Sequence, residues 1–128
     1  VVYFADHGEE VYDFRDTKGR HTETDPKPGT LMYQNEVPFV IWCSDRYKQL
    51  HPQVVDRIKQ ALHRPYMTDN VGQLMLDLGR IKTQYYIPDR DLIAPQFRPR
   101  KRLVYDHCDY DKVMRGVDRN KIYPRFVK

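Results

Sequence analysis

Two short runs of apolar residues dominate the hydrophobic pattern of this chain. The first covers Val1 to Ala5, the second covers Val37 to Cys43, and both are rich in β-branched and aromatic side chains. Such runs are typical of strands that are buried on both faces, as in a parallel sheet. Pro38 has no N–H to donate and fits only the start or the edge of its strand. We therefore predict that Val1 to Ala5 and Phe39 to Cys43 are neighbouring strands of one sheet.

Apolar residues then recur at helical spacing in two segments, residues 52–63 and residues 69–78. In the first they are Val54, Val55, Ile58, Ala61 and Leu62, and in the second Val71, Leu74, Met75 and Leu78. Pro52 suits the first turn of a helix, and Gly79 follows the last periodic residue of the second segment. The pattern predicts two amphipathic helices that flank the sheet, with the Met and Leu face in the core.

Residues 14–35 carry hardly any periodic apolar pattern and contain two glycines and two prolines. They predict a long loop, and long loops in compact domains are usually functional or mobile. This loop leaves the end of the first predicted strand, so His21 is a candidate to lie over a site there. The more common case is a solvated loop histidine.

The residues that end the first strand have the chemistry of a metal site. Asp6, His7 and Gly8 follow the apolar run directly, and ligands of open α/β sheets bind at the carboxyl ends of strands. A carboxylate and a neutral imidazole are both good zinc ligands, and glycine permits a sharp turn. Glu9 and Glu10 add negative charge beside them. The alternative is an ordinary turn with a surface histidine.

Composition and charge bound the remaining possibilities. The chain has 128 residues, of which 40% are hydrophobic and 31% charged, as expected for one globular core. Its formal net charge of +4 does not require a nucleic-acid partner. The basic segment Phe97 to Arg102 is interpreted as a solvated edge or a surface for anionic headgroups, rather than a nucleic-acid site. Cys43 and Cys108 form no CxxC motif, and their pairing is left open.

Several motifs resemble those of the phosphoethanolamine transferases in the alkaline phosphatase/sulfatase superfamily. The first is the segment Val2 to Asp13, with the sequence VYFADHGEEVYD, which is similar to the family's strand and "SDHGE" motif. Further similar segments follow in the family's order, covering about residues 1 to 111: Val37 to Ser44, Thr68 to Asn70, Leu74 to Gly79, Asp89 to Ile93, and Tyr110 with Asp111. Two positions depart from the pattern, because Ala5 replaces a serine and Glu36 replaces a histidine on the substrate side of many members.

The resemblance implies a fold and a set of roles. The fold would be α/β, a partial alkaline-phosphatase/sulfatase-like sheet flanked by helices. Asp6 and His7 would be zinc ligands, while the nucleophilic threonine and the other ligands would lie upstream of Val1. Candidates for substrate contact are Glu9, His21 and Glu36.

The resemblance also implies a place and partners. Residues 1–128 would be the C-terminal part of a catalytic domain that faces the periplasm, with missing N-terminal helices in the inner membrane. The enzyme would move phosphoethanolamine from a phospholipid donor, phosphatidylethanolamine, to a glycolipid or sugar of the cell envelope, as in lipopolysaccharide modification. Residues 1–128 alone would be inactive.

Two other functions fit parts of the same sequence. A sulfatase or a phosphoglycerol transferase of the same superfamily shares the DHG-type metal site. A non-catalytic module that binds anionic surfaces would explain the basic segment, but it leaves the Asp6-His7-Gly8 strand end unexplained.

Overall fold

The computed structural model describes residues 1–13 and 15–122, and it divides into two compact units. Unit 1 comprises residues Val1–Val2 and Val40–Arg100, and unit 2 comprises Tyr3–Phe39 and Lys101–Lys128. Each unit is described by itself. Among the described residues, no helix has both the length and the apolar character that a membrane span needs.

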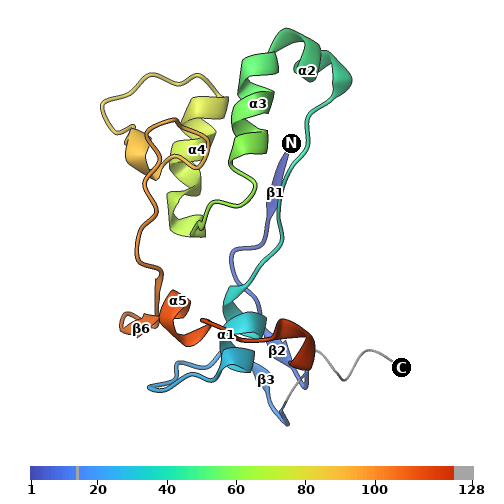
Figure 1. Cartoon of the computed structure of the whole chain (residues 1–128), viewed down its shortest axis with the longest axis vertical. Coiled ribbons are helices and arrows are strands. Elements are labelled where there is room, and N and C mark those ends of the chain that lie inside the picture. The colour runs from blue at the N-terminus through green and yellow to red at the C-terminus, as the bar shows by residue number, and fades with distance from the viewer. Residues whose placement is uncertain (14, 123–128) are drawn as a thin grey trace. The chain divides into compact units, whose positions relative to one another are not determined.

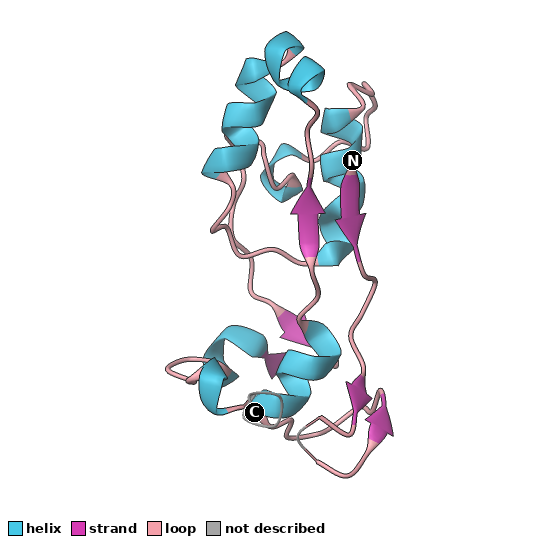
Figure 2. Cartoon of the chain, turned by 90° about the vertical axis from the view of Figure 1, so that its right-hand side faces the viewer, coloured by secondary structure: helices cyan, strands magenta, loops and turns pink. Residues whose placement is uncertain are grey.

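The two predicted strands form as β1 (Val2–Phe4) and β4 (Phe39–Ile41), and they pair in a two-stranded sheet (Figure 2). Their predicted neighbourhood is therefore confirmed. Val1 and Trp42, next to the strands, exchange both backbone hydrogen bonds at 2.8 Å. Such an exchange is the pattern of an antiparallel pair, so the expectation of a parallel sheet is wrong.

The expectation that both strands are buried on both faces is also wrong. Exposure alternates along them, and Tyr3 and Val40 point outward. The adjoining Trp42 is 59% exposed. The reason is geometric, because a pair of strands with alternating side chains buries one face only unless a further layer covers the other.

Unit 1 is mainly helical (Figure 1). Its helices are α2 (Asp45–Leu50), α3 (Pro52–Gln60) and α4 (Val71–Leu78), with single 3-10 turns η1 (Thr68–Asn70) and η2 (Pro88–Arg90). Ser44 caps α2 by accepting a hydrogen bond from the Tyr47 N–H at 3.2 Å. Pro52 occupies the first turn of α3, as predicted. This helix ends three residues earlier than expected, because the chain passes into a turn after Gln60.

The core of unit 1 is formed by side chains of α4 and of the segment that follows η2. Leu74, Ile93 and Ala94 are almost fully buried. Met75 is instead half exposed, so the prediction that the whole Met and Leu face of α4 is core was wrong. Met75 lines an apolar cavity of about 520 Å³ together with Trp42 and other residues of this unit. A bidentate ion pair, Arg57 to Asp77 at 2.6 and 3.3 Å, links α3 to α4.

The described part of unit 2 is built from two hairpins and two short helices. The elements are β2 (Glu10–Val11) paired with β3 (Lys18–Gly19), α1 (Pro28–Asn35), β5 (Leu103–Val104) paired with β6 (Cys108–Asp109), α5 (Tyr110–Val113) and the turn η3 (Arg119–Lys121). The core is formed by Leu31, Met32, Cys108, Tyr110 and Met114. Cys43 and Cys108 are both free thiols, so the pairing left open by the sequence is not formed.

The predicted loop at residues 14–35 was wrong where the structure describes it. Phe14 lies outside the described residues, but β3 and α1 both fall in this stretch. Pro28 stands in the first turn of α1, where its missing N–H costs nothing. Leu31 and Met32 are fully buried, so tertiary packing stabilises this helix. The helix is too short to show a clear helical period of apolar residues in the sequence.

Candidate functional site

The predicted zinc ligands lie in unit 2, directly after β1. The strand ends at Phe4, and the chain bends at Asp6. The Asp6 side chain is 87% exposed and the His7 side chain 35%. Both side chains are therefore accessible to a ligand.

The His7 ring is held by the backbone. Its Nδ1 atom lies 3.0 Å from the carbonyl oxygen of Gly8. A carbonyl oxygen can only accept, so Nδ1 carries the proton. In the neutral ring, Nε2 then presents its lone pair, which is the arrangement found in metal-bound histidines.

The Asp6 carboxylate converges on the same point. Its Oδ1 atom accepts a hydrogen bond from the His7 N–H at 3.0 Å, and its Oδ2 atom lies 3.6 Å from His7 Nε2. Two donors of a tetrahedral zinc ion with bonds of about 2.0 to 2.2 Å are about 3.3 to 3.6 Å apart. The spacing and the chemistry of this pair thus fit two positions of a zinc site.

Other donors do not complete the set within the described part of the chain. There, no group of three or more His, Cys, Asp and Glu side chains is placed to hold a metal ion. Glu9 is exposed on the loop, whereas Glu10 is only 1% exposed and is committed to an ion pair. Catalytic zinc sites use three protein ligands, so this pair is one donor short of a complete set.

Gly8 is required by close packing rather than by the sharp turn expected from the sequence. A Cβ atom at this position would lie 2.1 Å from the carbonyl oxygen of Tyr33, in the last turn of α1. The Gly8 N–H also donates to the carbonyl oxygen of Gln34 at 3.1 Å. The end of α1 therefore fixes the backbone next to His7.

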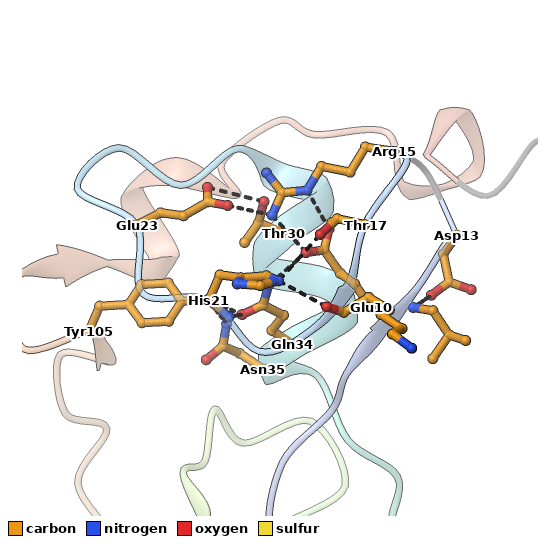
Figure 3. A network of polar contacts seen from close by, with 12 residues as sticks. Glu10, Asp13, Arg15, Thr17, His21, Glu23, Thr30, Gln34, Asn35 and Tyr105 are labelled. Carbon is orange, nitrogen blue, oxygen red and sulfur yellow. Dashed lines mark hydrogen bonds and ion pairs between the residues drawn. The ribbon is translucent and has the colours of Figure 1, made fainter.

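Glu10 is the centre of a buried polar network (Figure 3). Its carboxylate accepts two hydrogen bonds from Arg15, at 2.9 and 2.7 Å, and one from Gln34 Nε2 at 2.7 Å. Arg15 also donates to Glu23, which accepts a further hydrogen bond from Thr30. The hydrogen bond to Glu10 raises the pKa of Arg15, so this arginine stays charged.

The His21 ring forms its hydrogen bonds within its own hairpin, with Lys18 and Thr17, and not with Asp6 or His7. Its Nε2 atom lies 2.9 Å from the carbonyl oxygen of Lys18, and its backbone N–H donates to Gln34 Oε1 at 3.1 Å. The hydroxyl of Tyr105 donates to the same amide oxygen at 3.0 Å. His21 thus contributes to the packing around Gln34.

Glu36 lies just after α1 and forms a separate polar cluster. Its carboxylate accepts hydrogen bonds from the Tyr110 hydroxyl and from Arg119, the latter at 3.1 Å. Burial and the hydrogen bond to Glu36 raise the pKa of Tyr110 to about 12. The carboxylate is therefore engaged in this unit.

Sequence reasoning missed the network around Glu10. In β2 the charged Glu10 is buried while the apolar Val11 is exposed, which inverts the pattern that normally identifies the inner face of a strand. The partners Arg15 and Gln34 are 5 and 24 residues away, and no motif joins them. No signal in the single sequence could have found this network.

Comparison with curated proteins and protein families gives relatives for this chain. No family model matches it. It is 33% identical over 106 residues to phosphoethanolamine transferase EptC of Escherichia coli (strain K12), covering 81% of this chain and 17% of that protein. Phosphoethanolamine transferase CptA of Salmonella typhimurium matches with the same identity and coverage. The chain thus spans less than a fifth of the length of these relatives.

Two solved structures are similar as well. One is the crystal structure of the C-terminal periplasmic domain of E. coli EptC in complex with Zn, with a TM-score of 0.70 and 30% identity over 90% of this chain and 32% of that chain. The other is a crystal structure of the same domain, with a TM-score of 0.65 and 32% identity over 79% of this chain and 27% of that chain. These similarities confirm the α/β fold class.

Proposed function

Because this chain is homologous to the phosphoethanolamine transferases, we propose that residues 1–128 are the C-terminal part of the catalytic domain of a zinc-dependent phosphoethanolamine transferase. The parent enzyme would move phosphoethanolamine from phosphatidylethanolamine to a lipid or sugar of the cell envelope. Its catalytic domain would face the periplasm, and helices outside this chain would anchor it in the inner membrane.

One observation carries the proposal. The strand end brings Asp6 Oδ2 and His7 Nε2 to 3.6 Å from each other, with the Nδ1 proton of His7 held by the Gly8 carbonyl. We assign Asp6 and His7 as zinc ligands on this basis. The Zn complex of the E. coli EptC domain supports zinc as the metal.

The roles of these side chains follow from their chemistry. Bound zinc lowers the pKa of a nucleophilic hydroxyl and offsets negative charge on phosphoryl oxygens. Asp6 supplies negative charge to hold the cation, and His7 supplies a neutral donor of fixed orientation. The nucleophilic threonine would belong to a part of the parent protein that precedes Val1.

The three candidates for substrate contact differ in their surroundings. The side chains of His21 and Glu36 are engaged in hydrogen bonds of unit 2. Glu9 is exposed on the site loop, two residues after His7. An exposed carboxylate complements the ammonium group of phosphoethanolamine, so we place Glu9 first among the three.

The relatives support the transferase over its alternatives, since those reported above are named phosphoethanolamine transferases. The basic segment at residues 97–102 gives only weak support to the alternative function, a non-catalytic module that binds anionic surfaces. In unit 2, Lys101 pairs with Asp109 at 3.5 Å and Arg102 pairs with Asp111, so part of its charge is neutralised within the chain.

The test is made in the full-length enzyme, with Asp6→Ala, His7→Ala and the control His63→Ala, which changes an exposed histidine of unit 1. Transfer of a labelled phosphoethanolamine group from phosphatidylethanolamine to envelope lipid is measured, together with hydrolysis of an aryl sulfate. We expect transfer by the wild type and by His63→Ala, and none by the other two variants. Transfer within about tenfold of wild type in His7→Ala would contradict the assignment. Sulfate hydrolysis without transfer would favour the sulfatase.

A further inference from the structure

Gln34 holds the loop after His7 at two points. Its carbonyl oxygen accepts a hydrogen bond from the Gly8 N–H at 3.1 Å, and its side-chain amide donates to Glu10 Oε2 at 2.7 Å. Gln34 is fully buried at the end of α1. The segment that follows the proposed zinc ligands is therefore hydrogen-bonded to the C-terminal end of α1.

Glu10 also forms an ion pair with Arg15 inside unit 2. The carboxylate is 1% exposed, and Arg15 donates two hydrogen bonds to it. Movement of Glu10 would break these hydrogen bonds. The carboxylate would then be buried without partners, which carries a large desolvation cost. Figure 3 shows Glu10 between the arginine and the amide.

A chain of contacts leads from this ion pair to the metal-binding atom. Glu10 accepts a hydrogen bond from the Gln34 side chain, and the Gln34 carbonyl oxygen accepts one from the Gly8 N–H. The Gly8 carbonyl oxygen in turn accepts the hydrogen bond from His7 Nδ1 at 3.0 Å. The ring position of His7, and with it Nε2, depends on that carbonyl. Hydrogen-bond partners of this kind fix the tautomer and orientation of metal-bound histidines.

We infer that Glu10 is a positioning residue for the zinc ligands, whose buried carboxylate, bonded to Arg15 and Gln34, fixes the Gly8 backbone that orients His7. This inference rests on the proposed function. In the sequence, Glu9 and Glu10 are two adjacent acidic residues, and nothing there distinguishes this role of Glu10 from the role of Glu9.

The competing possibility is that Glu10 stabilises unit 2 without affecting His7. The two possibilities differ in their dependence on zinc. A misplaced ligand raises the zinc concentration needed for half-maximal activity, and excess zinc restores kcat. A purely structural loss lowers the melting temperature and the amount of active protein, but it leaves the zinc requirement unchanged.

The experiment uses the full-length enzyme with Glu10→Gln and the matched control Glu23→Gln. Glu23 accepts hydrogen bonds from the same Arg15 and from Thr30, and it lies outside the series of hydrogen bonds that joins Glu10 to Gln34 and Gly8. Zinc affinity is measured by competition with a chromogenic chelator, along with transfer activity against zinc concentration and the melting temperature of the metal-free protein. We expect zinc affinity to fall about tenfold or more in Glu10→Gln, with kcat recovered at high zinc, and to stay at the wild-type value in Glu23→Gln.

Glu10→Asp is measured alongside, because it keeps the charge and shortens the side chain by one methylene. Wild-type zinc affinity in folded Glu10→Gln or Glu10→Asp would overturn the inference, as would an equal loss in Glu23→Gln. His7→Ala distinguishes a failure of the proposed function from a failure of the positioning role of Glu10. If His7→Ala binds zinc as the wild type does, the proposed function fails, whereas a loss in His7→Ala without one in the Glu10 variants refutes the positioning role alone.

Discussion

Asp6 and His7 are adjacent in sequence, yet Asp6 Oδ2 and His7 Nε2 lie 3.6 Å apart. Successive side chains of a strand point to opposite faces, so two neighbours in an extended strand would diverge. They converge here because β1 ends at Phe4 and the chain bends at Asp6. The end of the strand, rather than the strand itself, thus brings together the two side chains proposed as zinc ligands.

The first prediction concerns the packing of Gly8. Gly8→Ala places a Cβ atom 2.1 Å from the Tyr33 carbonyl oxygen, so the loop or the end of α1 must shift. Overpacking of this kind costs about 1 to 3 kcal/mol, and we expect a lower melting temperature together with weaker zinc binding. Thermal unfolding followed by circular dichroism measures the first effect.

Gly72→Ala is the matched control. A Cβ atom at Gly72 meets nothing within 4 Å, and the residue lies in α4. Alanine is a better helix former than glycine by about 1 kcal/mol, so this variant should be as stable as the wild type or more so. A destabilised Gly72→Ala, or an unchanged Gly8→Ala, would contradict the packing described here.

The second prediction is a pH dependence of stability in unit 1. Asp91 is fully buried, and burial together with the neighbouring Asp77 raises its pKa to about 6, although the Tyr86 hydroxyl bonded to it at 2.7 Å opposes the shift. An unfolded aspartate titrates near pH ~3.9. Between these values the folded state binds more protons than the unfolded state, so the free energy of unfolding should fall as pH rises from about 4 to 6.

Urea unfolding at a series of pH values measures this slope. Asp91→Asn imitates the protonated carboxyl and should remove the dependence, whereas Asp89→Asn, which changes an exposed neighbour, should keep it. Wild-type stability that rises through this window in parallel with Asp91→Asn would show that Asp91 is not the group responsible.

The third prediction concerns Glu9 and the donor substrate. If its exposed carboxylate attracts the ammonium group, Glu9→Gln should raise KM for phosphatidylethanolamine up to about fivefold, since exposed ion pairs contribute about 1 kcal/mol or less. kcat should change little, and the effect should shrink at high salt because screening weakens exposed charges. An unchanged KM at low salt would remove Glu9 from the substrate site.

The fourth prediction concerns residues 1–128 in isolation. The described residues contain no group of three His, Cys, Asp or Glu side chains placed to hold a metal ion, while a catalytic zinc site needs three protein ligands. We therefore expect no transfer activity and an affinity no better than about micromolar, compared with the tight binding of complete sites. Calorimetric titration of the isolated chain with zinc measures this, and a nanomolar one-to-one site that is lost in His7→Ala would contradict it.

The sequence predicted the parts of this structure that depend on local patterns. The pairing of β1 with β4, the two helices after Pro52 and Thr68 and the position of Asp6 and His7 after the first strand are confirmed, and so is the family resemblance. The zinc-ligand role of Asp6 and His7 stays a prediction. The short helix α1 was missed because eight residues with two buried apolar side chains show no clear period. The network around Glu10 was missed because its members meet only through tertiary packing, and single-sequence periodicity carries no information about such contacts.

The central claim is that Asp6 and His7 bind one zinc ion, and crystallography at the zinc absorption edge tests it most directly. The crystal would contain the complete catalytic domain of the parent enzyme with zinc. We predict an anomalous peak at about 2.0 to 2.2 Å from both Asp6 Oδ2 and His7 Nε2, with His7 Nδ1 still bonded to the Gly8 carbonyl oxygen. A fully occupied zinc site that leaves either side chain unbound would contradict the account.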